Sequence, residues 1–306
     1  MKTINLGNSG ILASEIGLGC MRMNALTPAE VERVIKTSME AGINFFDHAD
    51  IYGAGASEEI FAKAITLTPS LRENMILQTK CGIIPGKMYD FSKEHILSSV
   101  DKSLQRLHTD YVDTFLLHRP DALMEPDEVA EAFSILQQQG KVRHFGVSNH
   151  TPMQMELLSK SLDTKLIINQ LQFGVMHTGM IDSGLMMNMK LDGGINRDGE
   201  ILDYCRLKDI TIQAWSPFQY GFFEGVFLDN PKFPEVNKVI NELAEQYNVS
   251  NTAIATAWIL RHPAKIQTIV GTMTPARIEA ITKASSVCLT REEWYRIYLA
   301  AGNMLP

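Results

Sequence analysis

The sequence predicts an α/β fold: a closed (β/α)8 TIM barrel with an N-terminal β-hairpin and extra C-terminal helices. Short continuous apolar runs alternate with amphipathic helical segments along the chain, which is typical of a parallel sheet covered by helices. The units repeat about eight times at near-equal spacing, as such a barrel requires. No shift in composition marks a linker, so we expect a single domain over residues 1–306. An open doubly wound sheet is the alternative, and it is disfavoured because no G-x-G-x-x-G motif follows the first strand.

The chain begins with a predicted hairpin and the first barrel unit. Extended runs at 3–6 and 11–13 flank a Gly/Asn turn, which is the pattern of a β-hairpin. A buried strand follows at 16–21. The Thr-Pro-Ala-Glu sequence at 27–30 combines an N-cap, a first-turn proline and a capping box, so a helix begins there. Gly42 suits the end of that helix.

The later elements follow from the same signals. Strand-length apolar runs predict further strands at 44–50, 75–80, 111–118, 142–149, 166–173, 210–215 and 266–272. Apolar residues at helical spacing, with Ser, Thr or Pro near several of the starts, predict helices. These helices lie at 57–65, 92–106, 125–140, 151–161, 201–208, 234–247, 251–261 and 274–281, with one more beginning at Thr290.

Two connections are too long to be simple turns. Residues 174–200 are rich in methionine, and residues 217–233 are rich in aromatic side chains. Both follow strands, and long loops at that end of a barrel often carry function. We expect them to form an adaptable apolar pocket wall; the alternative is a lid or partner surface that only packs on the barrel.

Composition and charge limit the classes of function. The apolar content of 45% and charged content of 21% are those of an ordinary globular protein. A net charge of −7 argues against a nucleic-acid partner. The four cysteines have no C-x-x-C spacing, and neither a signal peptide nor an apolar run of membrane-spanning length is apparent. We therefore expect a cytoplasmic protein with no membrane partner.

Polar side chains end three of the predicted strands. Asp47 and Tyr52 come at the end of one strand, Lys80 ends the next and His118 ends a third. Each has an ordinary explanation when it is considered alone, such as a turn cap, a solvated strand end or a buried core histidine. Because side chains at neighbouring strand ends of a barrel converge, we expect these four to form one proton-transfer site.

The chemistry of the four groups is consistent. A buried Lys80 ammonium needs a counter-ion, and Asp47 can supply it. That cation is expected to pull the pKa of Tyr52 below its reference of about 10. Tyr52 could then give a proton to a carbonyl oxygen, and His118 could donate a second hydrogen bond to it. Covalent catalysis is less supported, and a metal site as in barrel hydrolases is a remote alternative because a lysine fits it poorly.

Around these residues the chain resembles the aldo-keto reductase family of NADPH-dependent (β/α)8 barrels. The matching motifs run in order through most of the chain: Gly42-Ile43-Asn44-Phe45-Phe46-Asp47, Asp50-Ile51-Tyr52-Gly53, Thr79-Lys80, Leu116-Leu117-His118, Gly146-Val147-Ser148-Asn149, Asn169-Gln170, Trp215-Ser216-Pro217 and Val270-Gly271-Thr272 with Arg277. The resemblance implies a catalytic tetrad of Asp47, Tyr52, Lys80 and His118. It also implies reduction of an aldehyde or ketone by hydride transfer, with Tyr52 as the general acid.

The resemblance also implies which residues bind the cofactor. Ser148, Asn149 and Gln170 would bind the nicotinamide carboxamide, and Trp215 would stack on the ring. Ser216, Phe218 and the following loop would cover the pyrophosphate. The adenosine 2′-phosphate would lie at Gly271, Thr272 and Arg277, which makes NADPH or NADP the expected cofactor and NAD the less favoured one. Many family members have a lysine at the position of Gly271. The family often has an asparagine at the position of Ile281.

A second function of a different class stays open. The same fold could hold NADP(H) as a redox-sensing regulatory subunit with little turnover, although the complete tetrad favours an enzyme acting on small carbonyl compounds. The identity of the substrate and the oligomeric state do not follow from the sequence.

Overall fold

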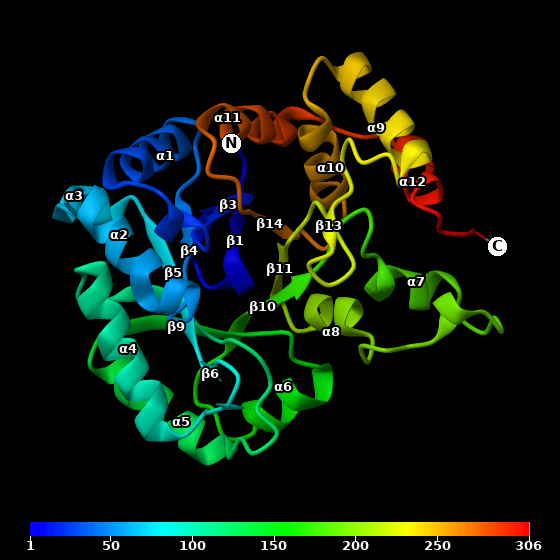
Figure 1. Cartoon of the computed structure of the whole chain (residues 1–306). Helices are drawn as coiled ribbons and strands as arrows, with labels where there is room; N and C mark the ends of the chain where they lie inside the picture. Colours follow the sequence, from blue (N-terminus) through cyan, green and yellow to red (C-terminus); the bar gives the residue numbers. More distant parts are fainter. Residues whose placement is uncertain (306) are drawn as a thin grey trace.

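The computed structural model describes residues 1–305 and confirms the predicted barrel (Figure 1). Eight parallel strands close on themselves in the order β10-β11-β14-β3-β4-β5-β8-β9. Their bounds are β3 (Ile16–Gly19), β4 (Phe45–Asp47), β5 (Ile76–Cys81), β8 (Val112–Leu117), β9 (Val142–Ser148), β10 (Leu166–Gln172), β11 (Thr211–Trp215) and β14 (Gln267–Val270).

A ring of helices surrounds the strands. It consists of α1 (Pro28–Glu40), α2 (Ala56–Ala64), α4 (Lys93–Leu107), α5 (Pro126–Gln138), α6 (Pro152–Ser159), α8 (Ile201–Leu207), α10 (Asn251–Leu260) and α11 (Pro275–Thr282). The capping box predicted at Thr27 and Glu30 is present, and Gly42 follows α1 with a φ of 89°. The capping box and the glycine therefore mark the start and the end of α1 as the sequence predicts.

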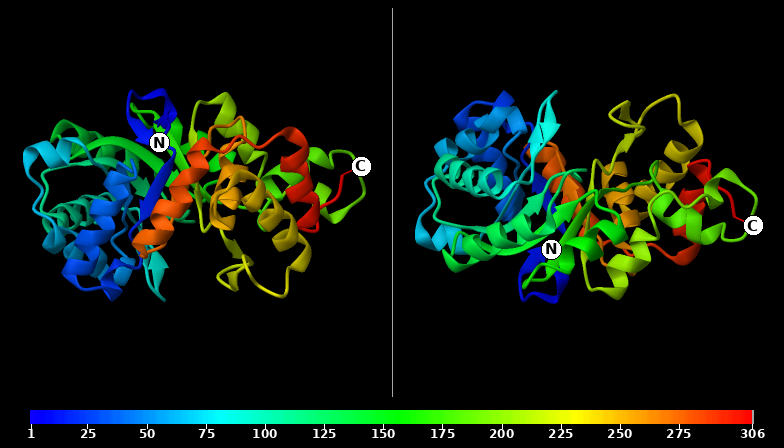
Figure 2. Two further views of the ribbon diagram at one scale, coloured as in Figure 1. Left: turned by 90° about the horizontal axis from the view of Figure 1, so that it is seen from above. Right: turned by 90° about the horizontal axis from the view of Figure 1, so that it is seen from below.

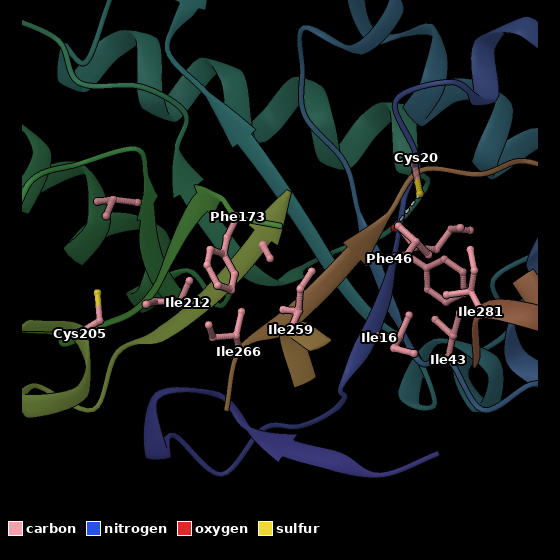
Figure 3. Packing of buried hydrophobic residues seen from close by; sticks show 14 of the residues in the cluster. Ile16, Cys20, Ile43, Phe46, Phe173, Cys205, Ile212, Ile259, Ile266 and Ile281 are labelled. Atoms are coloured by element: carbon pink, nitrogen blue, oxygen red, sulfur yellow. Dashed lines mark hydrogen bonds between the residues drawn. The ribbon is translucent and has the colours of Figure 1, made fainter. Parts of the chain in front are cut away.

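The core lies between the strands and this ring. Phe46 and Ile43 pack beside Ile281 of α11, and Ile16 of β3 lies next to them (Figure 3). All four side chains are almost completely buried. Along β4 the side chains alternate, because Phe45 belongs to the cluster inside the barrel while Phe46 faces the helices. Asp47 therefore points into the barrel, on the same side as Phe45.

The N-terminal hairpin closes one end of the barrel. It is formed by β1 (Thr3–Asn5) and β2 (Leu12–Ser14), and its turn backbone at Gly7 donates to Thr211 Oγ1 at 2.8 Å, where β11 begins. A Cβ atom on Gly7 would lie 2.5 Å from Ile167, so only glycine fits there. Two other hairpins, β6–β7 (Ile83–Ile84 and Met88–Tyr89) and β12–β13 (Gln219–Tyr220 and Gly225–Val226), lie at the opposite end (Figure 2). The carboxyl ends of the strands thus carry the longer loops.

The extra C-terminal elements lie outside the ring. Helices α9 (Pro234–Tyr247) and α12 (Arg291–Ala300) pack against each other at its edge. Trp258 of α10 and Trp294 of α12 stack with centroids 4.7 Å apart, and each indole N–H donates to the other residue's carbonyl at 3.0 Å. These contacts attach the last helix to the barrel.

The structure also contains elements that the sequence patterns do not predict. They are α3 (Pro69–Glu73), α7 (Gly179–Leu185) and the two short hairpins at the loop end. Elements of two to seven residues are too short to show a hydrophobic period, although Thr68 before Pro69 does cap α3. The strand predicted at 44–50 ends at Asp47, because the chain then turns through Gly53 and Gly55, both of which have positive φ. No helix in residues 1–305 is long and apolar enough to span a membrane.

Candidate active site

Three adjacent strands bring the four predicted catalytic side chains together. Asp47 is the last residue of β4, Lys80 lies near the end of β5, and His118 directly follows β8. Tyr52 lies on a short 3-10 turn, Tyr52–Gly55, that follows β4. The rings of Tyr52 and His118 meet edge to face with centroids 6.0 Å apart. The convergence expected at neighbouring strand ends is present.

The Lys80 ammonium is the centre of this group. It lies 2.7 Å from Asp47 Oδ1, with the Lys80 and Asp47 side chains 0% and 3% exposed. It also donates to the carbonyl of His48 at 2.8 Å and to Tyr52 Oη at 3.2 Å. Its three N–H bonds are thereby matched by three oxygen atoms. The predicted ion pair is present, and it lies within hydrogen-bonding distance of the tyrosine hydroxyl.

A layer of glutamines supports Asp47 from inside the barrel. Gln78 Nε2 and Gln170 Nε2 donate to Asp47 Oδ1 at 2.6 and 3.2 Å. Both also donate to Gln213 Oε1, and Gln213 donates to Gln267 at 2.8 Å. Strand register places Gln78 opposite Asp47, and Gln213 opposite both Gln170 and Gln267. A buried carboxylate that receives several N–H bonds is stabilised in its charged form.

Sequence patterns alone do not reveal this layer. Gln78, Gln213 and Gln267 each occur singly within an apolar strand, and only the barrel register shows that they lie at one level. The available signal was a glutamine in four strands that were expected to be buried. Gln170 is expected from the family resemblance to bind the nicotinamide carboxamide, and in the structure both of its N–H groups are used inside the protein. Its Oε1 is the atom left to accept a hydrogen bond from a carboxamide.

The expectation that Tyr52 has a lowered pKa is wrong for this structure. Burial raises the pKa of the Tyr52 phenol above its ordinary value, and the Lys80 cation only partly opposes this effect. Asp47, which is paired with Lys80, also raises it. Because the cation and the carboxylate lie together, their combined field at the phenol is weak. Tyr52 therefore stays protonated at neutral pH.

His118 is an uncharged imidazole. Burial lowers its pKa well below 6.5, and the cations of Lys80 and Arg119 lower it further. Its Nδ1 is buried and has no hydrogen-bond partner in the part of the chain that the structure describes. A neutral imidazole carries one N–H donor. His118 can therefore donate a hydrogen bond at the mouth of the barrel but carries no positive charge there.

The residues expected around the nicotinamide form one hydrogen-bonded chain. Trp215 Nε1 donates to Asn149 Oδ1 at 3.2 Å, and Asn149 Nδ2 donates to Ser148 Oγ at 2.8 Å. Ser148 Oγ in turn donates to the carbonyl of Gln170 at 2.9 Å. Asn149 has a φ of 60°, a conformation that asparagine tolerates better than most residues. Trp215 therefore fixes the amide of Asn149 in addition to presenting its own ring.

The aromatic loop crosses the mouth of the barrel. Phe223 stacks on Trp215 with centroids 5.9 Å apart, and Phe222 lies against Phe223. The Arg119 guanidinium, from the loop beside His118, lies 5.7 Å from the Phe222 ring centroid. The prediction of an apolar wall thus fits residues 217–233. Just before that loop Ser216 has a φ of 50°, and within the loop the ring of Phe218 packs on the core.

The methionine-rich connection lies elsewhere. Its helix α7 is at the edge of the molecule beside α12 (Figure 1). Tyr298 of α12 donates to Asp182 of α7 at 2.6 Å, and Met186 is buried. These contacts favour the alternative interpretation for residues 174–200, a lid or partner surface that only packs on the barrel.

The predicted phosphate residues lie on the segment after β14 and in the first turn of α11. Thr272 is partly exposed, and its Oγ1 accepts a bond from the Thr274 backbone at 3.3 Å. Arg277 is exposed in the first turn of α11, and none of residues 1–305 forms an ion pair with it. Gly271 leaves the rim without a side chain at this point. Within the same residues no group of three or more His, Cys, Asp or Glu could hold a metal ion.

One consequence of the site's burial is a pH dependence of stability. His48 is fully buried against Phe61, and neither ring nitrogen has a hydrogen-bond partner within residues 1–305. Burial and the Lys80 cation lower its pKa to about 3. An unfolded chain has a histidine pKa of about 6.5, so this contribution to stability is complete above pH 6.5 and is lost as pH falls toward 3. At pH 5 we expect a loss of roughly 2 kcal/mol from this residue. Denaturant unfolding at pH 7.5 and 5.0 measures it.

The matched variant is His48→Phe, which keeps an aromatic ring against Phe61. It should lose less stability than wild type between the two pH values, whatever its absolute stability. His150 and His262, with pKa values lowered to about 4, provide the same background in both proteins. Equal losses in the two proteins would show that His48 does not titrate on unfolding.

Comparison with known proteins identifies the class of this barrel. The model of the Aldo/keto reductase family matches residues 15–300, so the chain belongs to the aldo-keto reductase family of oxidoreductases. The uncharacterized oxidoreductase YcsN of Bacillus subtilis is 39% identical over 302 residues, covering 94% of both chains. The 6-dehydroglucose reductase of Novosphingobium aromaticivorans is 35% identical over 310 residues, covering 98% of this chain and 96% of its own.

Solved structures agree on the fold. The thermostable aldo-keto reductase Tm1743, solved with the inhibitor epalrestat, superposes with a TM-score of 0.79 at 24% identity and covers 98% of this chain and 100% of its own. An aldo-keto reductase from Klebsiella pneumoniae, solved with NADPH, superposes with a TM-score of 0.76 at 24% identity, covering 97% and 93% of the two chains.

Proposed function

We propose that the protein is an NADPH-dependent reductase that converts aldehydes or ketones to alcohols, with Tyr52 as the general acid. The observation that carries the proposal is the buried Lys80 ammonium, which joins Asp47 to the hydroxyl of Tyr52 beside His118. The family of oxidoreductases to which the chain belongs supports the reaction class.

The residues fit a nicotinamide cofactor. Asn149 and Gln170 offer amide atoms for a neutral carboxamide, Trp215 offers a partly exposed indole, and Arg277 is an exposed cation without an ion-pair partner in the described chain. When bound, NADPH supplies the hydride. The adenosine 2′-phosphate, which NADH lacks, is the group that Arg277 would select.

Proton transfer then depends on the protein's own groups. The oxygen of Tyr52 already accepts a hydrogen bond from Lys80, so its O–H is free to donate to the carbonyl oxygen of the substrate. As that proton leaves, the same Lys80 N–H stabilises the developing phenolate. His118, as a neutral donor, can hold the carbonyl oxygen in place. The raised pKa of Tyr52 keeps it protonated for this step at neutral pH.

Turnover with NADPH across a panel of carbonyl compounds tests the proposal. Because two relatives, at 35% and 33% identity, are named 6-dehydroglucose reductase, the panel should include 6-dehydroglucose and other sugar aldehydes beside simple aldehydes and ketones. We expect multiple turnovers with at least one of them. Tight NADPH binding without multiple turnovers would favour the redox-sensing subunit instead.

Arg277→Ala should weaken NADPH binding far more than NADH binding. The guanidinium would form charge-assisted hydrogen bonds to the 2′-phosphate, and their loss costs about 1.5–3 kcal/mol, roughly a 10- to 150-fold increase in Kd. Titration of protein fluorescence with each nucleotide gives both constants. Arg291→Ala, an exposed arginine on the distant helix α12, is the matched control and should change neither. Equal losses for NADPH and NADH would contradict the phosphate role of Arg277.

A further inference from the structure

The rim of the barrel has no side chain of its own at Gly271, and a guanidinium from another loop lies against this position. This residue directly follows β14. Among residues 1–305, apart from its two neighbours in the chain, a Cβ atom built on it would meet only one heavy atom within 4 Å, Arg22 Nη1 at 3.0 Å. Backbone and core atoms therefore do not fill this position. The one non-neighbouring group of the described chain that reaches it is the Arg22 guanidinium.

Arg22 comes from a different part of the sequence. It follows β3, which closes the barrel against β14 through the pair Leu18 and Val270. Arg22 Nη1 donates to the carbonyl of Gly271 at 2.9 Å across a sequence separation of 249 residues. Barrel closure thus brings a guanidinium to the position at which many family members carry a lysine side chain.

Most of the hydrogen-bonding capacity of Arg22 is unused. A guanidinium has five N–H donors, and the Gly271 carbonyl takes one of them. The side chain is exposed, and no carboxylate in residues 1–305 pairs with it. In a chain with a net charge of −7, an unpaired arginine at the rim is available to an anionic ligand.

We propose that Arg22 binds the adenosine 2′-phosphate of NADP(H), replacing the missing lysine at Gly271. The inference rests on the proposed function, since it names a further residue for the same cofactor. Arg22 and Arg277 then hold the phosphate from two elements, the loop after β3 and the first turn of α11, with the Thr272 hydroxyl on the segment between β14 and α11. A planar fork of donors suits a phosphate group better than a single ammonium does.

The first test is the variant Arg22→Met, which keeps an apolar stem and removes the charge. Titration with NADP⁺ and NAD⁺ should show a rise in Kd of about tenfold or more for NADP⁺ and of less than about threefold for NAD⁺. The fragments 2′,5′-ADP and 5′-AMP, which lack the nicotinamide, should show the same contrast. Arg33→Met, an exposed arginine on α1, is the matched control and should change none of these constants.

The second test is rescue. Gly271→Lys in the Arg22→Met background should restore most of the lost NADP⁺ affinity, because the new ammonium enters the vacated space. In the wild-type background the same substitution should increase NADP⁺ affinity little, since Arg22 already lies 3.0 Å from the position of the new Cβ. The two substitutions are therefore expected to be strongly non-additive.

Three results would overturn the inference. Equal losses for NADP⁺ and NAD⁺ would assign Arg22 to the pyrophosphate, and unchanged affinities would make it only a tie between β3 and β14. If Gly271→Lys did not restore NADP⁺ affinity to the Arg22→Met variant, the loss of affinity would not come from the loss of a positive charge. These results differ from failure of the proposed function, in which wild-type protein would bind no NADPH or reduce no carbonyl compound.

Discussion

Tyr52→Phe should reduce kcat for carbonyl reduction by about 10²- to 10⁴-fold, while the Kd for NADPH stays within about twofold. Phenylalanine keeps the ring that meets His118 edge to face but removes the only hydroxyl that Lys80 contacts. The ammonium retains Asp47 and the His48 carbonyl as partners, so the site should stay folded. Steady-state kinetics with a verified substrate, beside a fluorescence titration with NADPH, gives both quantities.

The control for this variant is another tyrosine that loses a partly buried hydrogen bond to its hydroxyl. Tyr247 on α9 donates to Glu293 at 2.8 Å, far from the strand ends that carry the tetrad. Tyr247→Phe should leave kcat unchanged even if it lowers the melting temperature. A Tyr52→Phe enzyme that keeps a rate close to wild type would remove Tyr52 from its role as the general acid.

The sequence predicts the barrel and the tetrad because both depend on local signals. Apolar runs end in Asp47, Lys80 and His118, and parallel strands place such ends at one rim. The prediction that Lys80 pairs with Asp47 needs only the rule that buried charges have partners. The single domain is inferred from the even composition, and the cytoplasmic location from the cysteine spacing and from the lack of an apparent signal peptide or membrane-length apolar run; both stay predictions.

Other features depend on distances that no local pattern encodes. Gln213 and Gln267 contact each other because strand register aligns them, and Arg22 reaches Gly271 because the first and last barrel strands are neighbours. The pKa of Tyr52 depends on the balance between burial and a nearby cation. The sequence identifies the cation but not the depth of burial, so the predicted direction of the shift is wrong.

Lys80→Met should lower both stability and catalysis, with NADPH still bound. Removing the ammonium leaves Asp47 as a buried anion, and breaking a buried pair typically costs about 3–5 kcal/mol. Gln78 and Gln170 still donate to Asp47, which places the expected loss toward the lower end of that range. The variant also loses the N–H that would stabilise the Tyr52 phenolate, so the rate of reduction should fall steeply. Thermal melts and single-turnover reduction measure the two effects separately.

The double variant Asp47→Asn with Lys80→Met separates the charge from the chemistry. No lone buried charge remains, and the asparagine oxygen can still accept from Gln78 and Gln170, so part of the lost stability should return. The rate should not return, because nothing replaces the Lys80 contact to Tyr52.

As a control, Arg72→Met breaks another buried pair, Arg72 with Asp113 at 2.8 Å, and should lower stability without changing the rate per folded molecule. A double variant no more stable than Lys80→Met alone would mean that Asp47 and Lys80 are not energetically coupled. Lys80 could then not support proton transfer from Tyr52 in the proposed way, because that role requires an ammonium that Asp47 holds beneath the phenol.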